Sequence, residues 1–237
     1  MDVVDSPALL ADRAADAFEY ACDAAIRGRG GFAVALSGGK TPRAMLETLG
    51  QRALDWSRIH FFWSDERCVS PDDPNSNYGM ARAALFDRAE VPSSNVHRMK
   101  GELDPQEGAH DYAEQLRVFF SAPPIFDLVY LGLGPDGHTA SLFPGTTALR
   151  VADAPCVANR VDGPVASPWR LTLTYPAINA ARRVLFLVEG SEKADILKQV
   201  VEGPRDVERY PAQGVAPASG DLVWLVDAAA AALLEVR

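Results

Sequence analysis

The chain has 237 residues, 48% of them hydrophobic, and a formal net charge of −9 at pH 7. This composition excludes a disordered chain, because enough apolar surface is present to offset the entropy lost when the backbone is ordered. The acidic charge argues against nonspecific binding to nucleic acid or to an anionic membrane surface. We therefore expect one globular domain over residues 1–237, and any bound anion must be held by a few local basic and N–H groups.

No apolar run reaches the roughly 18 residues needed to cross a bilayer. The N-terminal residues contain Asp2 and Asp5 instead of the basic segment of a signal peptide. Cys22, Cys68 and Cys156 are widely spaced and form no Cys-x-x-Cys pair. Neither a disulfide framework nor a zinc site is indicated, and the favoured interpretation is small, semi-buried thiols. We expect a cytoplasmic location.

Apolar runs of strand length alternate with helical patterns along the chain. Strands are predicted at 32–36, 59–63, 126–131, 170–174, 184–188 and 221–226. Helices are predicted at 42–54, near 78–86, from 105 toward 120, at 191–201 and at 228–234, and a loop at 203–220. Several strands lack polar alternation, as parallel strands covered on both faces do. The pattern predicts an α/β fold with an open, mostly parallel sheet and helices on both faces, Rossmann-like in type.

The first predicted strand is followed by Ser37-Gly38-Gly39-Lys40-Thr41-Pro42. In open α/β sheets, ligands bind outside the carboxyl ends of the strands. Two glycines let the backbone approach a ligand, and Pro42 suits the first turn of the helix that follows. Free N–H groups, hydroxyls and the helix dipole then converge, and Lys40 adds charge, so the segment predicts an anion site for phosphate. The alternative is a glycine turn capped by Ser or Thr. A P-loop is excluded, because its first glycine would fall at Val34.

Ser64-Asp65-Glu66-Arg67 follows the second predicted strand. An acidic pair and an arginine at a strand end suit a functional site, but a solvated loop with a local ion pair is an equal alternative. Further along the chain, Asn75-Ser76-Asn77-Tyr78 is interpreted as a polar turn that caps a helix.

Gly132-Leu-Gly134-Pro-Asp136-Gly137-His138-Thr139 follows the strand at 126–131. Its glycines match the G-x-G-x-x-G pattern of dinucleotide sites, but Asp136 would place a carboxylate against the pyrophosphate, so we reject that interpretation. What remains is a loop that presents Asp136 and His138 at the sheet edge. Imidazole titrates near neutrality, so His138 suits general base catalysis. The other histidines are interpreted as structural: His60, His97 and His110.

Two basic residues lie at other strand boundaries. Arg170 is the first residue of a predicted strand. Lys193 lies in the first turn of the predicted helix at 191–201, which follows the strand at 184–188. A lysine in the first turn opposes the helix dipole, which is easier to understand if an anion neutralises it. The alternative is an exposed lysine that costs about a few tenths of a kcal/mol.

These motifs resemble those of the 6-phosphogluconolactonase family. The resemblance covers nearly the whole chain in the family's order, and the block from Asp136 to Pro144 is very specific. Lys40 is a departure, because many members carry Ser or another small residue there. The matching segments are 36–42, 63–67, 76–77, 131–144, 170–174, 190–193 and 224–228.

The resemblance implies a fold of the sugar-phosphate isomerase type and hydrolysis of 6-phospho-D-glucono-1,5-lactone to 6-phosphogluconate in the pentose phosphate pathway. It implies that His138 is the general base on water. Asp136 would orient the loop or polarise His138, Arg67 would be an anion clamp or oxyanion partner, and Asp65 is a further catalytic candidate. The substrate phosphate would be bound by Ser37, Gly38, Gly39, Lys40, Thr41, Arg170 and Lys193.

The chemistry of a lactone supports this assignment independently. Its carbonyl needs only an activated water and stabilisation of the oxyanion, so we expect no metal and no cofactor. The expected partner is a small-molecule sugar-phosphate lactone, with no nucleic acid and no membrane, and we expect a monomer or a weak dimer.

Two alternatives stay open. The first is an aldose-ketose isomerase or deaminase of the same fold. Glucosamine-6-phosphate deaminase, in the wider superfamily, resembles this chain in the glycine loop, the Asp-Glu pair and Asp-Gly-His. It carries Glu five residues after the His, where this chain has Phe143, and Tyr where this chain has Arg67; both departures favour the lactonase. The second alternative is a catalytically silent sugar-phosphate sensor. It is weakened because no DNA-binding helix pair precedes Phe32 and because the acidic charge opposes DNA contact.

Overall fold

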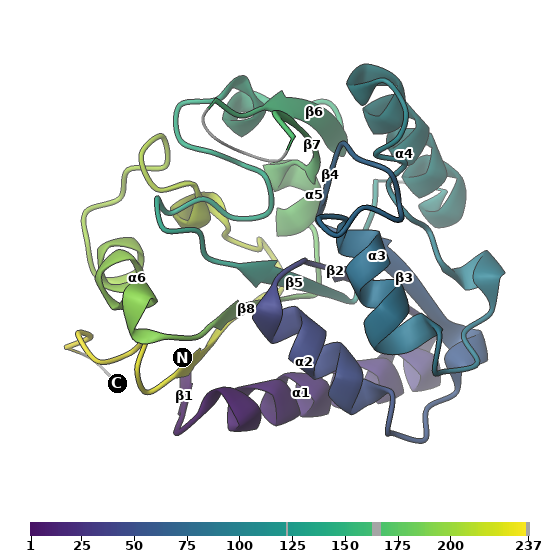
Figure 1. The fold of residues 1–237 in the computed structure, drawn as a ribbon, viewed down its shortest axis with the longest axis horizontal. Coiled ribbons are helices and arrows are strands. Elements are labelled where there is room, and N and C mark those ends of the chain that lie inside the picture. Colours follow the sequence, from purple (N-terminus) through teal and green to yellow (C-terminus); the bar gives the residue numbers. More distant parts are fainter. Residues whose placement is uncertain (122, 163–166, 236–237) are drawn as a thin grey trace.

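A central sheet of six parallel strands organises the molecule. The computed structural model describes residues 1–121, 123–162 and 167–235. The strand order is β1-β9-β8-β5-β2-β3, and each neighbouring pair is parallel (Figure 1). The open parallel α/β architecture predicted from the sequence is confirmed. The strands are β1 (Asp2–Val4), β2 (Phe32–Leu36), β3 (Ile59–Trp63), β5 (Leu128–Gly132), β8 (Arg183–Val188) and β9 (Asp221–Asp227).

Helices cover both faces of this sheet. Helices α1 and α2 pack against each other on one face, while α5 and a smaller sheet lie over the other (Figure 1). None of the described helices is long and apolar enough to cross a membrane. The helices are α1 (Pro7–Arg29), α2 (Lys40–Leu49), α3 (Asn77–Ala81), α4 (Pro105–Phe120), α5 (Tyr175–Asn179) and α6 (Ala194–Val201).

Helix α1 is an element that the sequence analysis missed. Ser6 caps its N-terminus by accepting a hydrogen bond from the Leu9 amide, and Gly30 ends it in a left-handed conformation with φ +84°. Its buried face is lined largely by small residues, among them Ala11, Ala14 and Ala15. Alanines produce a weak apolar pattern, and for that reason periodicity did not reveal the longest helix of the chain.

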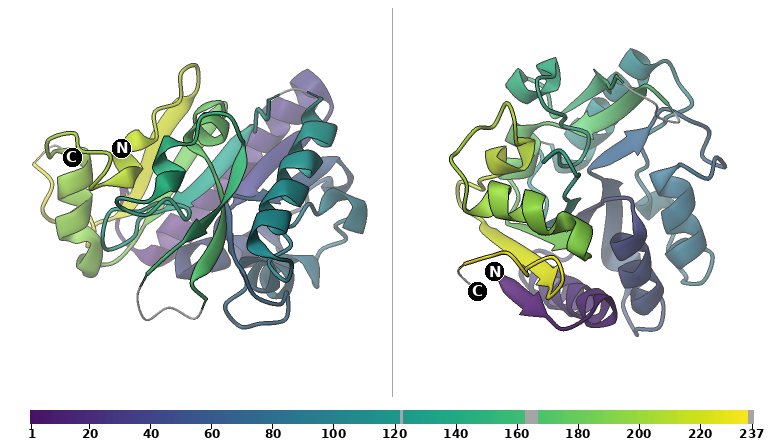
Figure 2. Two further views of the ribbon diagram at one scale, coloured as in Figure 1. Left: turned by 90° about the horizontal axis from the view of Figure 1, so that it is seen from above. Right: turned by 60° about the vertical axis from the view of Figure 1, so that its left-hand side comes forward.

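The smaller sheet over the second face has three antiparallel strands (Figure 1). Its order is β4 (Asp65–Arg67), β7 (Trp169–Leu173) and β6 (Cys156–Arg160), and α4 packs against β6 and β7 (Figure 2). The predicted strand at 170–174 therefore belongs to this sheet and not to the parallel one, which corrects the sequence analysis. Ser64 joins the sheets: its amide donates to the Leu36 carbonyl (2.7 Å) and its carbonyl accepts from the Leu173 amide (2.8 Å).

Two predicted helices differ in the structure. Helix α2 ends at Leu49, five residues before the expected end, because Gly50 and a turn follow it. The predicted closing helix at 228–234 is a series of turns, which the Asp227 carboxylate begins by accepting from the Ala230 amide (2.7 Å). Residues 203–220 form a loop, as expected, with a short 3-10 turn at Pro211–Gly214.

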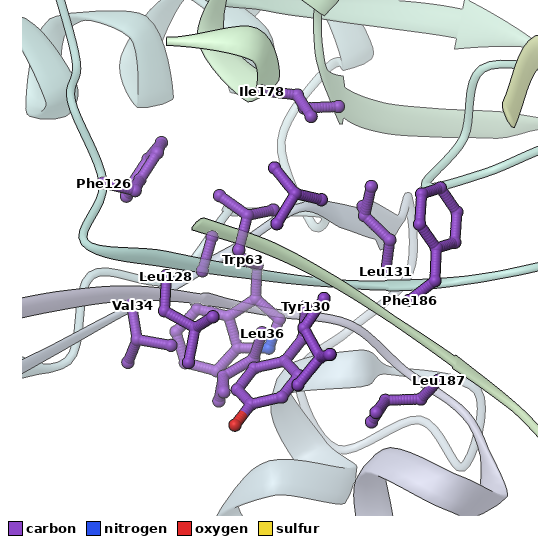
Figure 3. Close-up of a cluster of buried hydrophobic side chains, with 14 of the residues drawn as sticks. Val34, Leu36, Trp63, Phe126, Leu128, Tyr130, Leu131, Ile178, Phe186 and Leu187 are labelled. Carbon is purple, nitrogen blue, oxygen red and sulfur yellow. The ribbon is translucent and has the colours of Figure 1, made fainter. Parts of the chain in front are cut away.

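The core fills both faces of the central strands. Figure 3 shows neighbouring residues of β5, Tyr130 and Leu131, pointing to opposite sides of the sheet, and both are fully buried. The Tyr130 hydroxyl donates to the Ala14 carbonyl of α1 (2.8 Å), so its buried polar atom is satisfied. Strands that are apolar on both faces give no polar alternation, which is the pattern that the sequence displays.

Candidate active site

A cleft of about 420 Å³ opens at the carboxyl ends of β2 and β5. From β2 the chain proceeds to β3 on one side, and from β5 to β8 and β9 on the other, so this is the point where the strand order reverses. Such a reversal leaves a crevice in which open α/β folds bind ligands. The lining residues are Ser37, Gly38, Gly39, Asp65, Arg67, Asn77, Gly132, Leu133, Gly134, Pro135, His138, Ala140, Ser141, Phe143, Arg170 and Lys193.

A larger groove of about 1020 Å³ lies elsewhere, between the C-terminal half of α4 and the start of α5. Its lining consists mainly of alanine, proline and valine, and its Arg117 is already paired with Glu114 (2.8 Å). The smaller cleft is the candidate site, because charged and titratable side chains from separate segments converge there.

The loop after β2 presents backbone and a hydroxyl to the cleft. Gly39 has φ +115°, which disfavours any side chain. Gly38 leaves room for Asn77, since a Cβ there would lie 1.8 Å from Asn77 Oδ1. Ser37 Oγ is buried and has no hydrogen-bond partner within the described part of the chain. A buried hydroxyl beside a cleft is then available to a ligand.

Alternation along β4 decides which of its side chains face the cleft. Asp65 and Arg67 lie on one face of the strand, and Glu66 lies on the other. In the antiparallel register with β7, Arg67 lies directly opposite Arg170, and Asp65 opposite Thr172. Directly opposed residues share a face of the sheet, so the two arginines are brought to the same wall of the cleft.

Three cations in the cleft have no anionic partner among the residues that the structure describes. Arg67 Nη1 donates to the Asn75 carbonyl (2.5 Å), and Lys193 Nζ to the Leu133 carbonyl (2.9 Å). Arg170 Nη1 donates to the carbonyls of Ser167 and Trp169. Among residues 1–121, 123–162 and 167–235, no carboxylate oxygen lies within 4.0 Å of any of these three cationic groups.

Burial and the repulsion between Arg67 and Arg170 favour an anion in the cleft. Burial lowers the pKa of Arg170, and the positive charge of Arg67 lowers it further. The charges of Asp65 and Glu66 oppose this shift only in part, so two guanidinium groups on the same wall of the cleft favour binding of a negatively charged ligand. In a chain with a net charge of −9, this cleft is a local exception to the overall charge.

Asp65 ties the walls of the cleft together. It is buried, and Oδ2 accepts from the Ser141 hydroxyl (2.7 Å) while Oδ1 accepts from Asn77 Nδ2 (3.3 Å). The same Asn77 group also donates to the Asp65 carbonyl (2.8 Å). Asn77 and Ser141 are cleft residues that the sequence analysis did not select. The polar Asn-Ser-Asn turn was a visible signal for Asn77, but a helix cap was a sufficient explanation for it.

Glu66 is buried, so the interpretation of its segment as a solvated loop is wrong. The carboxylate accepts from the amides of Arg67 (2.8 Å), Asn77 (2.7 Å) and Tyr78 (2.8 Å) and from the Ser76 hydroxyl (3.0 Å). Burial raises the pKa of Glu66, and the backbone N–H groups oppose that shift. Together with Ser76, whose Oγ accepts from the Gly79 amide (3.0 Å), Glu66 fixes the start of α3. The predicted helix cap is confirmed.

His138 and Asp136 form a hydrogen-bonded pair at the mouth of the cleft. Asp136 Oδ1 lies 2.6 Å from His138 Nδ1 and also accepts from the His138 amide (3.1 Å). Burial would raise the pKa of Asp136, but the hydrogen bonds from His138 outweigh it and leave the pKa below its ordinary value. An ionised carboxylate only accepts hydrogen bonds, so Nδ1 carries the proton and the lone pair of the neutral ring is on Nε2.

Two residues of the predicted phosphate loop lie outside the cleft lining. The Lys40 side chain is 87% exposed and its ammonium pairs with Glu189 (3.3 Å) across the neighbouring loop. Thr41 is buried in the first turn of α2. The charge expected from Lys40 is supplied inside the cleft by Lys193, from the segment after β8.

The remaining histidines do not line the cleft. His60 Nδ1 and His97 Nε2 lie 3.1 Å apart; the His97 ring stacks on Phe62, and the His60 ring packs at an angle against Phe119. Burial lowers the pKa of His97 to about 4, and the charge of His60 contributes. Within the described residues, no group of three or more His, Cys, Asp or Glu side chains is placed to hold a metal ion.

Comparison with known proteins identifies close relatives. Residues 5–224 match the family described as glucosamine-6-phosphate isomerases/6-phosphogluconolactonase. The chain is 45% identical to a 6-phosphogluconolactonase of Nostoc sp. strain PCC 7120, over 98% of this chain and 96% of that one. It is 40% identical to the human 6-phosphogluconolactonase, over 96% and 88% of the two chains.

Solved structures with a similar fold include a member of the same family. A 6-phosphogluconolactonase from Thermotoga maritima is 32% identical, with a TM-score of 0.83 over 95% of this chain and 97% of that one. A monomeric glucosamine-6-phosphate deaminase has a TM-score of 0.82 over 99% and 100% of the chains, but at 24% identity this likeness concerns the fold alone.

Proposed function

The chain belongs to the family of glucosamine-6-phosphate isomerases and 6-phosphogluconolactonases, and we propose on this premise that it hydrolyses 6-phospho-D-glucono-1,5-lactone to 6-phosphogluconate, a step of the oxidative pentose phosphate pathway. The observation that carries the proposal is one cleft with both parts of the required chemistry. Three cations that form no ion pair within the described part of the chain, Arg67, Arg170 and Lys193, fit a phosphorylated substrate, and the Asp136–His138 pair fits activation of water.

The first step of the proposed reaction uses His138 as a general base. Nε2 takes a proton from a water molecule as the water oxygen bonds to the lactone carbonyl carbon, which gives a tetrahedral oxyanion. Asp136 keeps the proton on Nδ1 and stabilises the imidazolium that forms. Collapse of the intermediate breaks the bond to the ring oxygen. His138 then returns its proton to this leaving oxygen, and the product is the open-chain acid.

The phosphate is assigned to the side of the cleft where the cations converge. The Ser37–Gly39 loop offers an unpartnered hydroxyl and backbone N–H groups near the start of α2. Arg170 and Lys193 supply charge, and Arg67 shares the anion with Arg170 because the two lie opposite each other in the sheet. We thus assign Arg67 to the phosphate and not to the oxyanion. Lys40 is left out of this set, since its ammonium pairs with Glu189.

The test is a coupled assay. Lactone generated by glucose-6-phosphate dehydrogenase should be converted to a substrate of 6-phosphogluconate dehydrogenase faster than it hydrolyses spontaneously, and the second equivalent of NADPH reports the rate. A second arm measures ammonia released from glucosamine 6-phosphate. Acceleration in the first arm alone supports the lactonase. Ammonia release without lactone hydrolysis would assign the chain to the deaminase branch. No activity in either assay would favour a sugar-phosphate sensor.

A further inference from the structure

The imidazole of His138 is enclosed on one side by the backbone of Gly134. A Cβ at Gly134 would lie 2.0 Å from Nδ1 and 2.1 Å from Cε1 of the ring. Gly134 is not among the glycines with a positive φ, so space for the ring, and not backbone conformation, requires a glycine here. The imidazole thus lies directly against the Gly134 Cα, where any other residue would displace it.

Phe143 covers the ring as well. The centroids of the Phe143 and His138 rings are 4.1 Å apart, with an angle of 33° between their planes. The tight turn between them has Ala140 in a left-handed conformation with φ +48°, and the Leu142 amide donates to the Thr139 carbonyl (2.9 Å). This turn folds the chain back so that Phe143 reaches the imidazole five residues after it.

The end of the turn is anchored independently of the histidine. The Phe143 carbonyl accepts from the Thr146 hydroxyl (2.8 Å), and the Gly145 amide donates to the Glu208 carbonyl (3.0 Å). The backbone at Phe143 is therefore held by contacts that do not involve His138, and it fixes the point from which the phenyl ring reaches the imidazole. A side chain fixed in this way can hold a neighbour in place.

We propose that Phe143 is a positioning residue for His138: the phenyl ring and the Gly134 backbone confine the imidazole, Asp136 fixes its orientation, and Nε2 is aimed into the cleft before substrate arrives. The inference rests on the proposed lactonase function. Side-chain torsions at the imidazole of histidine are broad, so hydrogen bonding by Asp136 alone leaves the ring free to tilt. Confinement removes that freedom in advance, and small displacements of a catalytic group are costly to the rate.

The test compares three phenylalanine variants in the intact chain. In Phe143→Leu, kcat should fall about 10- to 100-fold while KM stays within about two-fold, because the general base is misplaced but the residues that bind the phosphate are unchanged. In Phe143→Tyr, which keeps an aromatic ring packed on the imidazole, kcat should stay within about three-fold of wild type. Phe119→Leu is the matched control: it removes a partly buried ring from α4, outside the cleft, and should leave kcat unchanged.

A second readout follows the imidazole itself. The Hε1 proton signal of His138 is identified by its loss in His138→Gln. It should carry the ring-current shift of an adjacent aromatic ring in wild type and in Phe143→Tyr, and should lose that shift in Phe143→Leu. Wild-type kcat in Phe143→Leu, or equal losses in the Leu and Tyr variants, would overturn the proposal. If the wild-type protein is inactive but its signals behave as described, the lactonase function is refuted, while the contact between Phe143 and His138 is supported.

Discussion

The side chain of His138 is 25% exposed, with Nδ1 engaged by Asp136, so Nε2 is the ring atom free for proton transfer. We predict that His138→Gln lowers kcat by on the order of 10²–10⁴ and leaves the affinity for 6-phosphogluconate nearly unchanged, because a general base contributes to the transition state and not to ground-state binding. The coupled assay gives kcat, and calorimetric titration with product gives the affinity. Turnover near that of wild type would remove His138 from the mechanism.

The cations that line the cleft give a prediction about substrate choice. Arg170→Ala and Lys193→Ala should each weaken 6-phosphogluconate binding by about 1.5–3 kcal/mol, the magnitude of a charge-assisted hydrogen bond. Hydrolysis of unphosphorylated gluconolactone should hardly change. The double variant should lose less than the sum, since both residues share one ligand group.

Lys40→Ala is the control for this series. Its ammonium is largely exposed and paired with Glu189, so the substitution should leave phosphate affinity almost unchanged. Titration of all four variants with 6-phosphogluconate tests the set. Equal losses toward phosphorylated and unphosphorylated lactones would mean that Arg170 and Lys193 support the fold or the chemistry instead.

Among the connecting segments, the 203–220 loop has a role that its composition did not indicate. The Ala212 amide donates to the Gly137 carbonyl (2.9 Å), next to His138. Behind this contact, the hydroxyl of Tyr175 in α5 donates to the Pro211 carbonyl (2.7 Å). A segment rich in proline and glycine therefore supports the back of the loop that carries the proposed base.

This contact gives a prediction for Tyr175→Phe. The variant keeps the ring but leaves the Pro211 carbonyl without its donor, so the free energy of unfolding should fall by about 0.5–1.5 kcal/mol. Because the loop is loosened locally, the Ala212 amide should exchange its hydrogen faster, while amides of β5 keep their protection. Denaturant titration and hydrogen exchange measure the two effects. Unchanged exchange at Ala212 would show that the hydroxyl does not hold the loop.

For the molecule as a whole, stability should depend on pH through the His60–His97 pair. Burial lowers the pKa of both histidines in the folded state, to about 4 for His97 from an ordinary value of 6.5. Between these values the unfolded chain binds more protons than the folded one. The contribution of the histidine pair to stability is therefore fully present above about pH 6.5, and it should be lost as the pH falls from about 6.5 toward 4.

The check for this prediction is a comparison of wild type with His97→Gln by urea denaturation across that pH range. Carboxylates titrate in both proteins, so the difference between the two curves isolates the histidine. The variant should show a shallower loss of stability toward low pH. Parallel curves would exclude the pair as a source of the pH dependence.

The sequence by itself determined the features that depend on local order. Apolar runs that fill both faces of a strand, separated by helical segments, specify a buried parallel sheet wherever the chain is read. Glycine-rich turns after 32–36 and 126–131 mark carboxyl ends of strands, and these ends share one edge of such a sheet. Hence the loops of Ser37 and His138 were expected at one place, and the structure brings them to the same cleft.

Only the tertiary structure decided which distant side chains meet. A strand of three residues, such as β4, is too short for periodicity to show which face is buried, so the inward Arg67 and the buried Glu66 could not be told apart. Pairing between β4 and β7 is a long-range contact, and it alone places Arg67 opposite Arg170. The exposure of the Lys40 side chain and the contact of the Phe143 ring with His138 likewise depend on packing between segments, which local sequence patterns do not encode.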